Sequence, residues 1–213
     1  MSHVVIVDYG IGNIKSVQRG LEYVGAKTTL SAEPEVISNA DYLVLPGVGA
    51  FEDGMKGLKK IGVTEAILSF KSKGNPLLGI CLGMQMMLDF SEEHGFHQGL
   101  GIIQGGVKTI PQKENGQFKR KTPHIGWSEL RFPVGRDTWK RSCLAHTSPG
   151  KSFYFVHSFM AAPEDSRDIL AQSEYEGILI VAAVQKDNVT GLQFHPEKSG
   201  KDGLKILQSF TKK

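Results

Sequence analysis

The stretch LLGICLGMQ, Leu77–Gln85, places one cysteine between two glycines at the end of an apolar run. The run LLGI predicts a buried strand, and LGMQMMLDFSEE predicts a helix that begins directly after Cys81. Small residues on either side of a nucleophile permit a sharp strand-to-helix turn that exposes its side chain above a sheet. The alternative is a small thiol that fills the core, because cysteine is among the most buried residue types.

Strands and helices alternate along the first half of the chain, on the N-terminal side of this stretch. The predicted elements, in chain order, are the strand Val4–Val7, the helix Asn13–Gly25, the strand Tyr42–Gly47 and the helix Thr64–Gly74. Continuous apolar runs such as VVIV are typical of strands buried on both faces, and glycine ends both helices. We therefore expect an α/β fold with a central, mostly parallel sheet flanked by helices.

The second half of the chain has a different pattern. Short strand-like runs separated by polar turns lead to VTGLQFHPE, Val189–Glu197, which predicts one more strand. The tail predicts a closing helix, with Ser199 and Asp202 spaced as in a capping box. We expect added antiparallel strands here. Since no linker or repeat interrupts the chain, we also expect a single domain over residues 1–213.

Composition excludes several classes of protein. The chain has 40% hydrophobic and 22% charged residues, and its formal net charge of +3 is too small to indicate nucleic-acid binding. The polar segments Pro111–Lys121 and Lys119–His124 are interpreted as solvated loops. The N-terminal apolar run is too short for a membrane span and has no signal-peptide pattern. The chain has two cysteines, Cys81 and Cys143, which fits a reducing compartment, so we expect a cytoplasmic protein. Cys143 is expected to be inert.

Neither a metal ion nor a cofactor is expected. The turn DYGIGNIK has Lys15 where the dinucleotide-binding fingerprint requires its third glycine. No CxxC pattern indicates a zinc site, and His94 and His97 have no converging ligands.

A second motif supplies partners for a reactive Cys81. His195 in QFHPEKS follows a strand, and Glu197 is near enough to bind the far imidazole nitrogen. Nucleophile, base and orienting carboxylate form the pattern of a catalytic triad. The alternative is a surface histidine beside a glutamate. The backbone N–H of Leu82 and a second one from the glycine turn LPGVGAF would face a developing oxyanion, unless that segment is an ordinary tight turn.

Together these segments resemble the class I, triad-type glutamine amidotransferases, which have a flavodoxin-like α/β fold. More narrowly, they are similar to the glutaminase subunits of imidazole glycerol phosphate synthases. The resemblance covers nearly the whole chain and is carried by DYGIGNI, LPGVGAF, GICLGMQ, PHIGW, YFVHS and QFHPEKS. PGVGAF and PHIGW are the more specific segments. The sequence departs from the pattern at Gln104, in place of a proline, and in the loop 112–121.

The resemblance implies a role for each matching residue. Cys81 would attack the amide carbon of glutamine, with His195 transferring protons and Glu197 orienting it. Leu82, Val48 and Gly49 would supply oxyanion N–H groups, after a reorientation of the glycine turn that depends on the partner. The residues implied for the glutamine pocket are Gln85, Glu93, His157 and Ser158. Those implied for the partner face are Asn13, His124, Trp127, Tyr154 and Lys198.

The implied partner is a cyclase subunit with a (β/α)8 barrel, in a heterodimer. Ammonia would pass through the barrel to a phosphoribosyl intermediate, giving imidazole glycerol phosphate and an aminoimidazole carboxamide ribotide in histidine biosynthesis. Three alternatives stay open: a subunit that feeds another ammonia acceptor, such as a sugar-modifying enzyme; a self-sufficient cysteine hydrolase; and a non-catalytic interaction module on the same fold.

Overall fold

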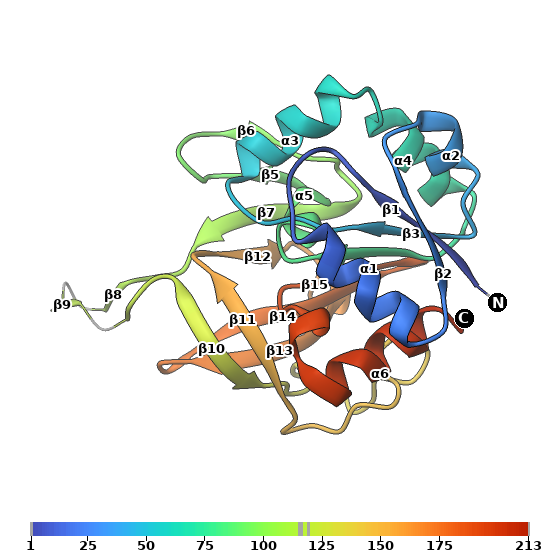
Figure 1. Cartoon of the computed structure of the whole chain (residues 1–213). Coiled ribbons are helices and arrows are strands. Elements are labelled where there is room, and N and C mark those ends of the chain that lie inside the picture. Colours follow the sequence, from blue (N-terminus) through green and yellow to red (C-terminus); the bar gives the residue numbers. More distant parts are fainter. Residues whose placement is uncertain (1, 115–116, 119, 213) are drawn as a thin grey trace.

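The computed structural model describes residues 2–114, 117–118 and 120–212 (Figure 1). The strands of its largest sheet are β1 (His3–Val7), β2 (Lys27–Ser31), β3 (Tyr42–Leu45), β4 (Leu77–Ile80), β13 (Ile169–Tyr175), β14 (Ile178–Lys186) and β15 (Val189–Leu192). They are ordered β13-β14-β15-β4-β3-β1-β2. Strands β15, β4, β3, β1 and β2 run parallel, while β13 and β14 are antiparallel additions at one edge. The predicted α/β fold is therefore confirmed.

Helices cover both faces of this sheet. They are α1 (Ile14–Tyr23), α2 (Pro34–Ser38), α3 (Phe51–Lys60), α4 (Thr64–Ser72), α5 (Leu82–Met86) and α6 (Gly200–Phe210). Helices α1 and α6 lie together on one face, and α2, α3 and α4 on the other (Figure 1). In β1, Val5 and Val7 pack into the α2–α4 core, whereas Val4 and Ile6 pack into the α1–α6 core. Burial on both faces explains why the VVIV run has no polar alternation.

The remaining strands lie beside the central sheet. A four-stranded sheet has the order β12-β7-β5-β6, formed by β5 (Leu88–Ser91), β6 (His97–Gln98), β7 (Ile103–Thr109) and β12 (Phe159–Pro163). Strands β10 (His124–Glu129) and β11 (Ser152–His157) pair antiparallel. Four short elements complete the described chain. Two form the hairpin of β8 (Lys113–Glu114) with β9 (Gln117–Phe118), and two are the 3₁₀ turns η1 (Ser166–Asp168) and η2 (Pro196–Lys198).

The helix predicted after Cys81 is wrong in length. It ends at Met86, and Leu88 already begins strand β5, which pairs with Ile103 of β7. The carbonyl of Met87 accepts the backbone N–H groups of Ile102 and Ile103 instead of continuing the helix. Pairing with a distant segment has overridden the local helical pattern.

Two further local predictions are wrong. Ser199 does not cap α6 with its side chain: its hydroxyl donates to the His195 carbonyl (2.6 Å) and accepts from the Tyr154 N–H (3.0 Å). The segment before β10 is not wholly solvated either. Arg120 is buried and donates to the Glu176 carbonyl, and His124 is also buried. Lys119 lies outside the described residues. Ser199, Arg120 and His124 are each held by a residue that is remote in sequence.

Every helix in the described part of the chain is too short or too polar to cross a lipid bilayer. The described residues also contain no group of three His, Cys, Asp or Glu side chains placed to hold a metal ion.

Candidate active site

Cys81 lies on a sharp turn between β4 and α5, with backbone angles φ 54° and ψ −110°. A positive φ costs a non-glycine residue about 1–3 kcal/mol, and surrounding contacts must hold it. Here the Cys81 N–H donates to the Leu192 carbonyl across 2.7 Å. Gly83 permits the close approach of α5 to the sheet, because a Cβ there would lie 1.8 Å from the carbonyl oxygen of Leu45. The sequence thus folds into the predicted elbow.

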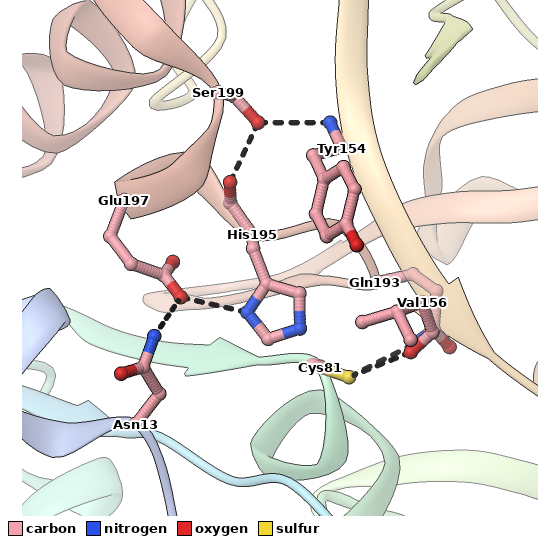
Figure 2. A network of polar contacts seen from close by, with 8 residues as sticks. All are labelled: Asn13, Cys81, Tyr154, Val156, Gln193, His195, Glu197 and Ser199. Atoms are coloured by element: carbon pink, nitrogen blue, oxygen red, sulfur yellow. Dashed lines mark hydrogen bonds and ion pairs between the residues drawn. The ribbon is translucent and has the colours of Figure 1, made fainter. Parts of the chain in front are cut away.

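His195 and Glu197 meet Cys81 from the other side of the cleft. Nδ1–H of His195 donates to Oε1 of Glu197 across 2.8 Å, and both side chains are almost fully buried. The Nε2 atom has no hydrogen-bond partner among the described residues and points towards the Cys81 sulfur (Figure 2). Burial opposes protonation of the imidazole, but the contacts with Cys81 and Glu197 outweigh it and raise the pKa of His195 to about 9.

The main chain of His195 is held by strand β11. Its N–H donates to the Tyr154 carbonyl across 2.9 Å, and its carbonyl accepts the Ser199 hydroxyl (Figure 2). On the far side, Asn13 Nδ2 donates to Oε1 of Glu197 at 3.4 Å. Two segments distant in sequence, at Asn13 and Tyr154, therefore position this pair of residues together with the nearby Ser199.

The predicted site residues converge on one cavity of about 240 Å³. Those that line it are Val48, Gly49, Cys81, Leu82, Gln85, Glu93, His157, Ser158 and His195, and Glu197 stands behind His195. The acidic member, Glu93, accepts the N–H of Phe51 through Oε2 across 2.6 Å. Its carboxylate thus holds the start of α3 while it faces the cavity.

The glycine turn packs directly under the elbow. Leu82 N–H, one predicted oxyanion donor, donates to the Gly47 carbonyl at 3.3 Å. Tyr9 holds the same turn by donating its hydroxyl to the Pro46 carbonyl across 2.7 Å. Gly49 adopts a φ of 101°, which permits the chain to turn beside the cavity. In this arrangement the Leu82 N–H is already hydrogen-bonded to the Gly47 carbonyl.

The residues predicted for the partner face do not all lie on one surface. Trp127 is 57% exposed and lies edge-on to Tyr154, and the Lys198 ammonium is 5.9 Å from the Tyr154 ring centroid. These three form one surface, which is joined to the site because the Tyr154 carbonyl accepts the His195 N–H. His124 does not belong to that surface: it is buried and hydrogen-bonded to His157 at 3.1 Å. Asn13 is partly buried against Glu197.

The sequence profile of the family Glutamine amidotransferase class-I matches residues 5–213. The chain belongs to this family. It is 50% identical over 210 residues to imidazole glycerol phosphate synthase subunit HisH 1 of Legionella pneumophila (strain Lens), covering 99% of both chains. It is 44% identical to the HisH subunit of Geobacter metallireducens (strain ATCC 53774 / DSM 7210 / GS-15), and the match covers 99% of this chain and 98% of that subunit. The fold also matches the structure of PurLQS from Thermotoga maritima, with a TM-score of 0.72, 18% identity, and 99% and 98% coverage.

Sequence reasoning missed two groups around the Cys81 sulfur, the candidate nucleophile of this class-I glutamine amidotransferase, and one group that holds Gln85. Gln193 approaches the Cys81 sulfur through Nε2 at 3.7 Å, and the Val156 carbonyl lies 3.8 Å from the same sulfur. The Phe159 carbonyl accepts Gln85 Nε2 at 3.0 Å. Gln193 stands two positions before His195, so strand periodicity was the signal that could have found it. The other two groups are backbone carbonyls, and the side chains of Val156 and Phe159 give no indication of those contacts.

Proposed function

We propose that this chain is the glutaminase subunit of an imidazole glycerol phosphate synthase, which releases ammonia from glutamine for a cyclase subunit. The observation that carries the proposal is the approach of Cys81 and the unpartnered Nε2 of His195 to one cavity, with Glu197 on the opposite imidazole nitrogen. The names of the full-length relatives support the same assignment.

The chemistry follows from this geometry. The Cys81 sulfur forms a bond to the amide carbon of glutamine, and its proton passes to Nε2 of His195. The tetrahedral intermediate collapses when His195 returns that proton to the leaving nitrogen, releasing ammonia and leaving a thioester. Water then gives one proton to His195 and attacks the thioester carbon. Collapse of that intermediate releases glutamate and restores the Cys81 thiol. Glu197 keeps Nδ1 protonated, so that Nε2 faces the substrate.

We assign the oxyanion donors to Leu82 and to the Val48–Gly49 turn. The Leu82 N–H reaches a developing oxyanion only after the Gly47 carbonyl moves away from it. The same movement would reorient the N–H groups of Val48 and Gly49. Docking of a partner beside this turn is therefore our proposed trigger for activity.

We assign glutamine binding to the other side chains that line this cavity. The Glu93 carboxylate is suited to the α-ammonium group of glutamine, while Gln85, His157 and Ser158 surround the rest of the molecule. A cavity of about 240 Å³ suits a small amino acid better than a peptide. This size argues against a self-sufficient peptidase.

We propose that the partner is a cyclase with a (β/α)8 barrel, and that it forms a heterodimer through the surface of Trp127, Tyr154 and Lys198. The Tyr154 carbonyl accepts the His195 N–H, so this surface is joined to the site, and we infer that released ammonia enters the partner from there. We also infer that residues 1–213 work as one domain, because both hydrophobic cores share the central sheet. A reducing cytoplasm is the proposed location, since the reaction needs a reduced Cys81.

The decisive experiment measures glutamate release from glutamine under three conditions: the chain alone, with a histidine-pathway cyclase, and with that cyclase plus its nucleotide ligand. Strong stimulation in the third condition is expected, with none for the Cys81→Ala variant. Steady turnover by the chain alone, unaffected by the cyclase, would contradict the proposed partner. Glutaminase activity that survives in Cys81→Ala would contradict the proposed nucleophile.

A further inference from the structure

The amide of Gln193 faces the Cys81 sulfur. Gln193 is fully buried and directly follows β15, two positions before His195. Its Nε2 is 3.7 Å from Cys81 Sγ, and its Oε1 accepts Gln85 Nε2 at 2.9 Å (Figure 2 shows Gln193 beside the sulfur). No part of the proposed glutaminase mechanism has so far used this group.

Hydrogen bonding fixes which end of the Gln193 amide faces the sulfur. The carbonyl of Phe159 can only accept, and it lies 3.0 Å from the nitrogen that Gln85 directs at it. The Gln85 group at that position is therefore the NH₂ end, which has a second proton to donate. That proton goes to the oxygen of Gln193, so the NH₂ end of Gln193 must face Cys81. The orientation is set by a backbone carbonyl outside both side chains.

The two neighbours of the sulfur favour opposite protonation states. The Val156 carbonyl, 3.8 Å away, accepts the proton of a thiol but repels a thiolate. An N–H donor does the reverse, since hydrogen bonds to ionised acceptors are about twice as strong as neutral ones. We propose that Gln193 is a catalytic contact that donates to the Cys81 thiolate and increases its population, with Gln85 as its positioning residue. This inference rests on the proposed function only through the role of Cys81.

The test measures alkylation of Cys81 by iodoacetamide against pH on the full chain, without glutamine or a cyclase. Gln193→Met keeps the volume but removes the donor. Gln193→Glu keeps the size and polarity and replaces the donor by an acceptor. The control Gln185→Met alters a glutamine whose Nε2 donates to the Arg141 carbonyl, away from the site. Peptide mass mapping separates modification of Cys81 from that of Cys143.

We expect Gln193→Met to alkylate about tenfold more slowly at neutral pH, with the inflection about one pH unit higher. Gln193→Glu should shift the inflection further in the same direction, and Gln185→Met should match the wild type. A merely structural role would not order the two variants in this way. Wild-type pH profiles in both folded Gln193 variants would overturn the inference. If wild-type Cys81 itself shows no selective alkylation, the proposed nucleophile fails as well.

Discussion

Leu82 donates its backbone N–H to the Gly47 carbonyl across 3.3 Å, immediately beside the nucleophile candidate. The donor that we propose for the oxyanion hole is therefore occupied by the neighbouring turn. Tyr9 reinforces this arrangement by donating its hydroxyl to the Pro46 carbonyl. The pKa of the Tyr9 phenol is raised, mainly by burial and to a smaller extent by the charge on Cys81, so the hydroxyl keeps its proton and remains a donor. Glutaminase activity should then be limited by release of this turn.

Replacing Tyr9→Phe should raise glutaminase activity in the absence of a partner. The variant loses one buried hydrogen bond to the turn, worth about 1 kcal/mol, which corresponds to about a fivefold shift between two conformations. Tyr23→Phe is the matched control, because Tyr23 is 80% exposed. The measurement is glutamate release by the isolated chain, alongside thermal unfolding. Reduced stability with unchanged or lower activity would contradict control by this turn.

Replacing Glu197→Gln should lower kcat by at least about 100-fold with little change in KM. The loss of negative charge removes one of the contacts that raise the pKa of His195 to about 9, so that pKa should fall. Steady-state kinetics and an NMR titration of the histidine measure the two effects. Glu174→Gln, which alters an exposed ion pair with Arg131, should leave both unchanged. Near-normal kcat in Glu197→Gln would show that the imidazole needs no orienting charge.

Replacing Glu93→Gln should raise KM for glutamine by roughly tenfold or more, because an ionic contact with the α-ammonium group is lost. The amide oxygen can still accept the Phe51 N–H, so the start of α3 and the stability should be retained. Glu92→Gln, at the adjacent exposed position, is the control. Kinetics with the activating partner present give KM and kcat separately. A loss confined to kcat would place Glu93 outside ground-state glutamine binding.

Acid should destabilise the fold through two buried histidines. Burial lowers the pKa of His157 to about 3, although the Phe159 carbonyl raises it and His124 and His195 lower it further. Burial also lowers the pKa of His124 to about 4, against the raising effect of Glu176. Below the ordinary value of 6.5, the unfolded chain binds protons that the folded chain does not. The free energy of unfolding should therefore fall from about pH 6.5 towards pH 4.

Each histidine contributes at most about 1.4 kcal/mol per pH unit to that fall. Urea unfolding at several pH values measures the slope, and His157→Gln should make it shallower. The exposed His146→Gln is the control and should keep the wild-type slope. An unchanged slope in His157→Gln would mean that this imidazole is protonated in the folded state.

Much of the fold and of the candidate site was predictable from short motifs. The run LLGI and the glycines around Cys81 predicted a strand-to-helix elbow, and the structure contains it between β4 and α5. Local patterns failed where a remote segment competed. The helix after the elbow stops at Met86 because the following residues form β5 and pair with β7. The Ser199 hydroxyl donates to the His195 carbonyl instead of capping its own helix. Strand β2 and helices α2 and α3 were not predicted.

The sequence by itself determined most strands of the parallel sheet, the elbow around Cys81, and the triad pattern with His195 and Glu197, because these depend on residue type and close spacing. Tertiary structure alone decided that Leu82 is bound to Gly47, that His124 is buried, and that Gln193 faces the Cys81 sulfur. Backbone carbonyls direct the contacts of Leu82 and Gln193, and the rings of Phe155 and Tyr175 cover His124. Carbonyl groups are the same in every residue, and only the folded chain brings particular ones to particular donors.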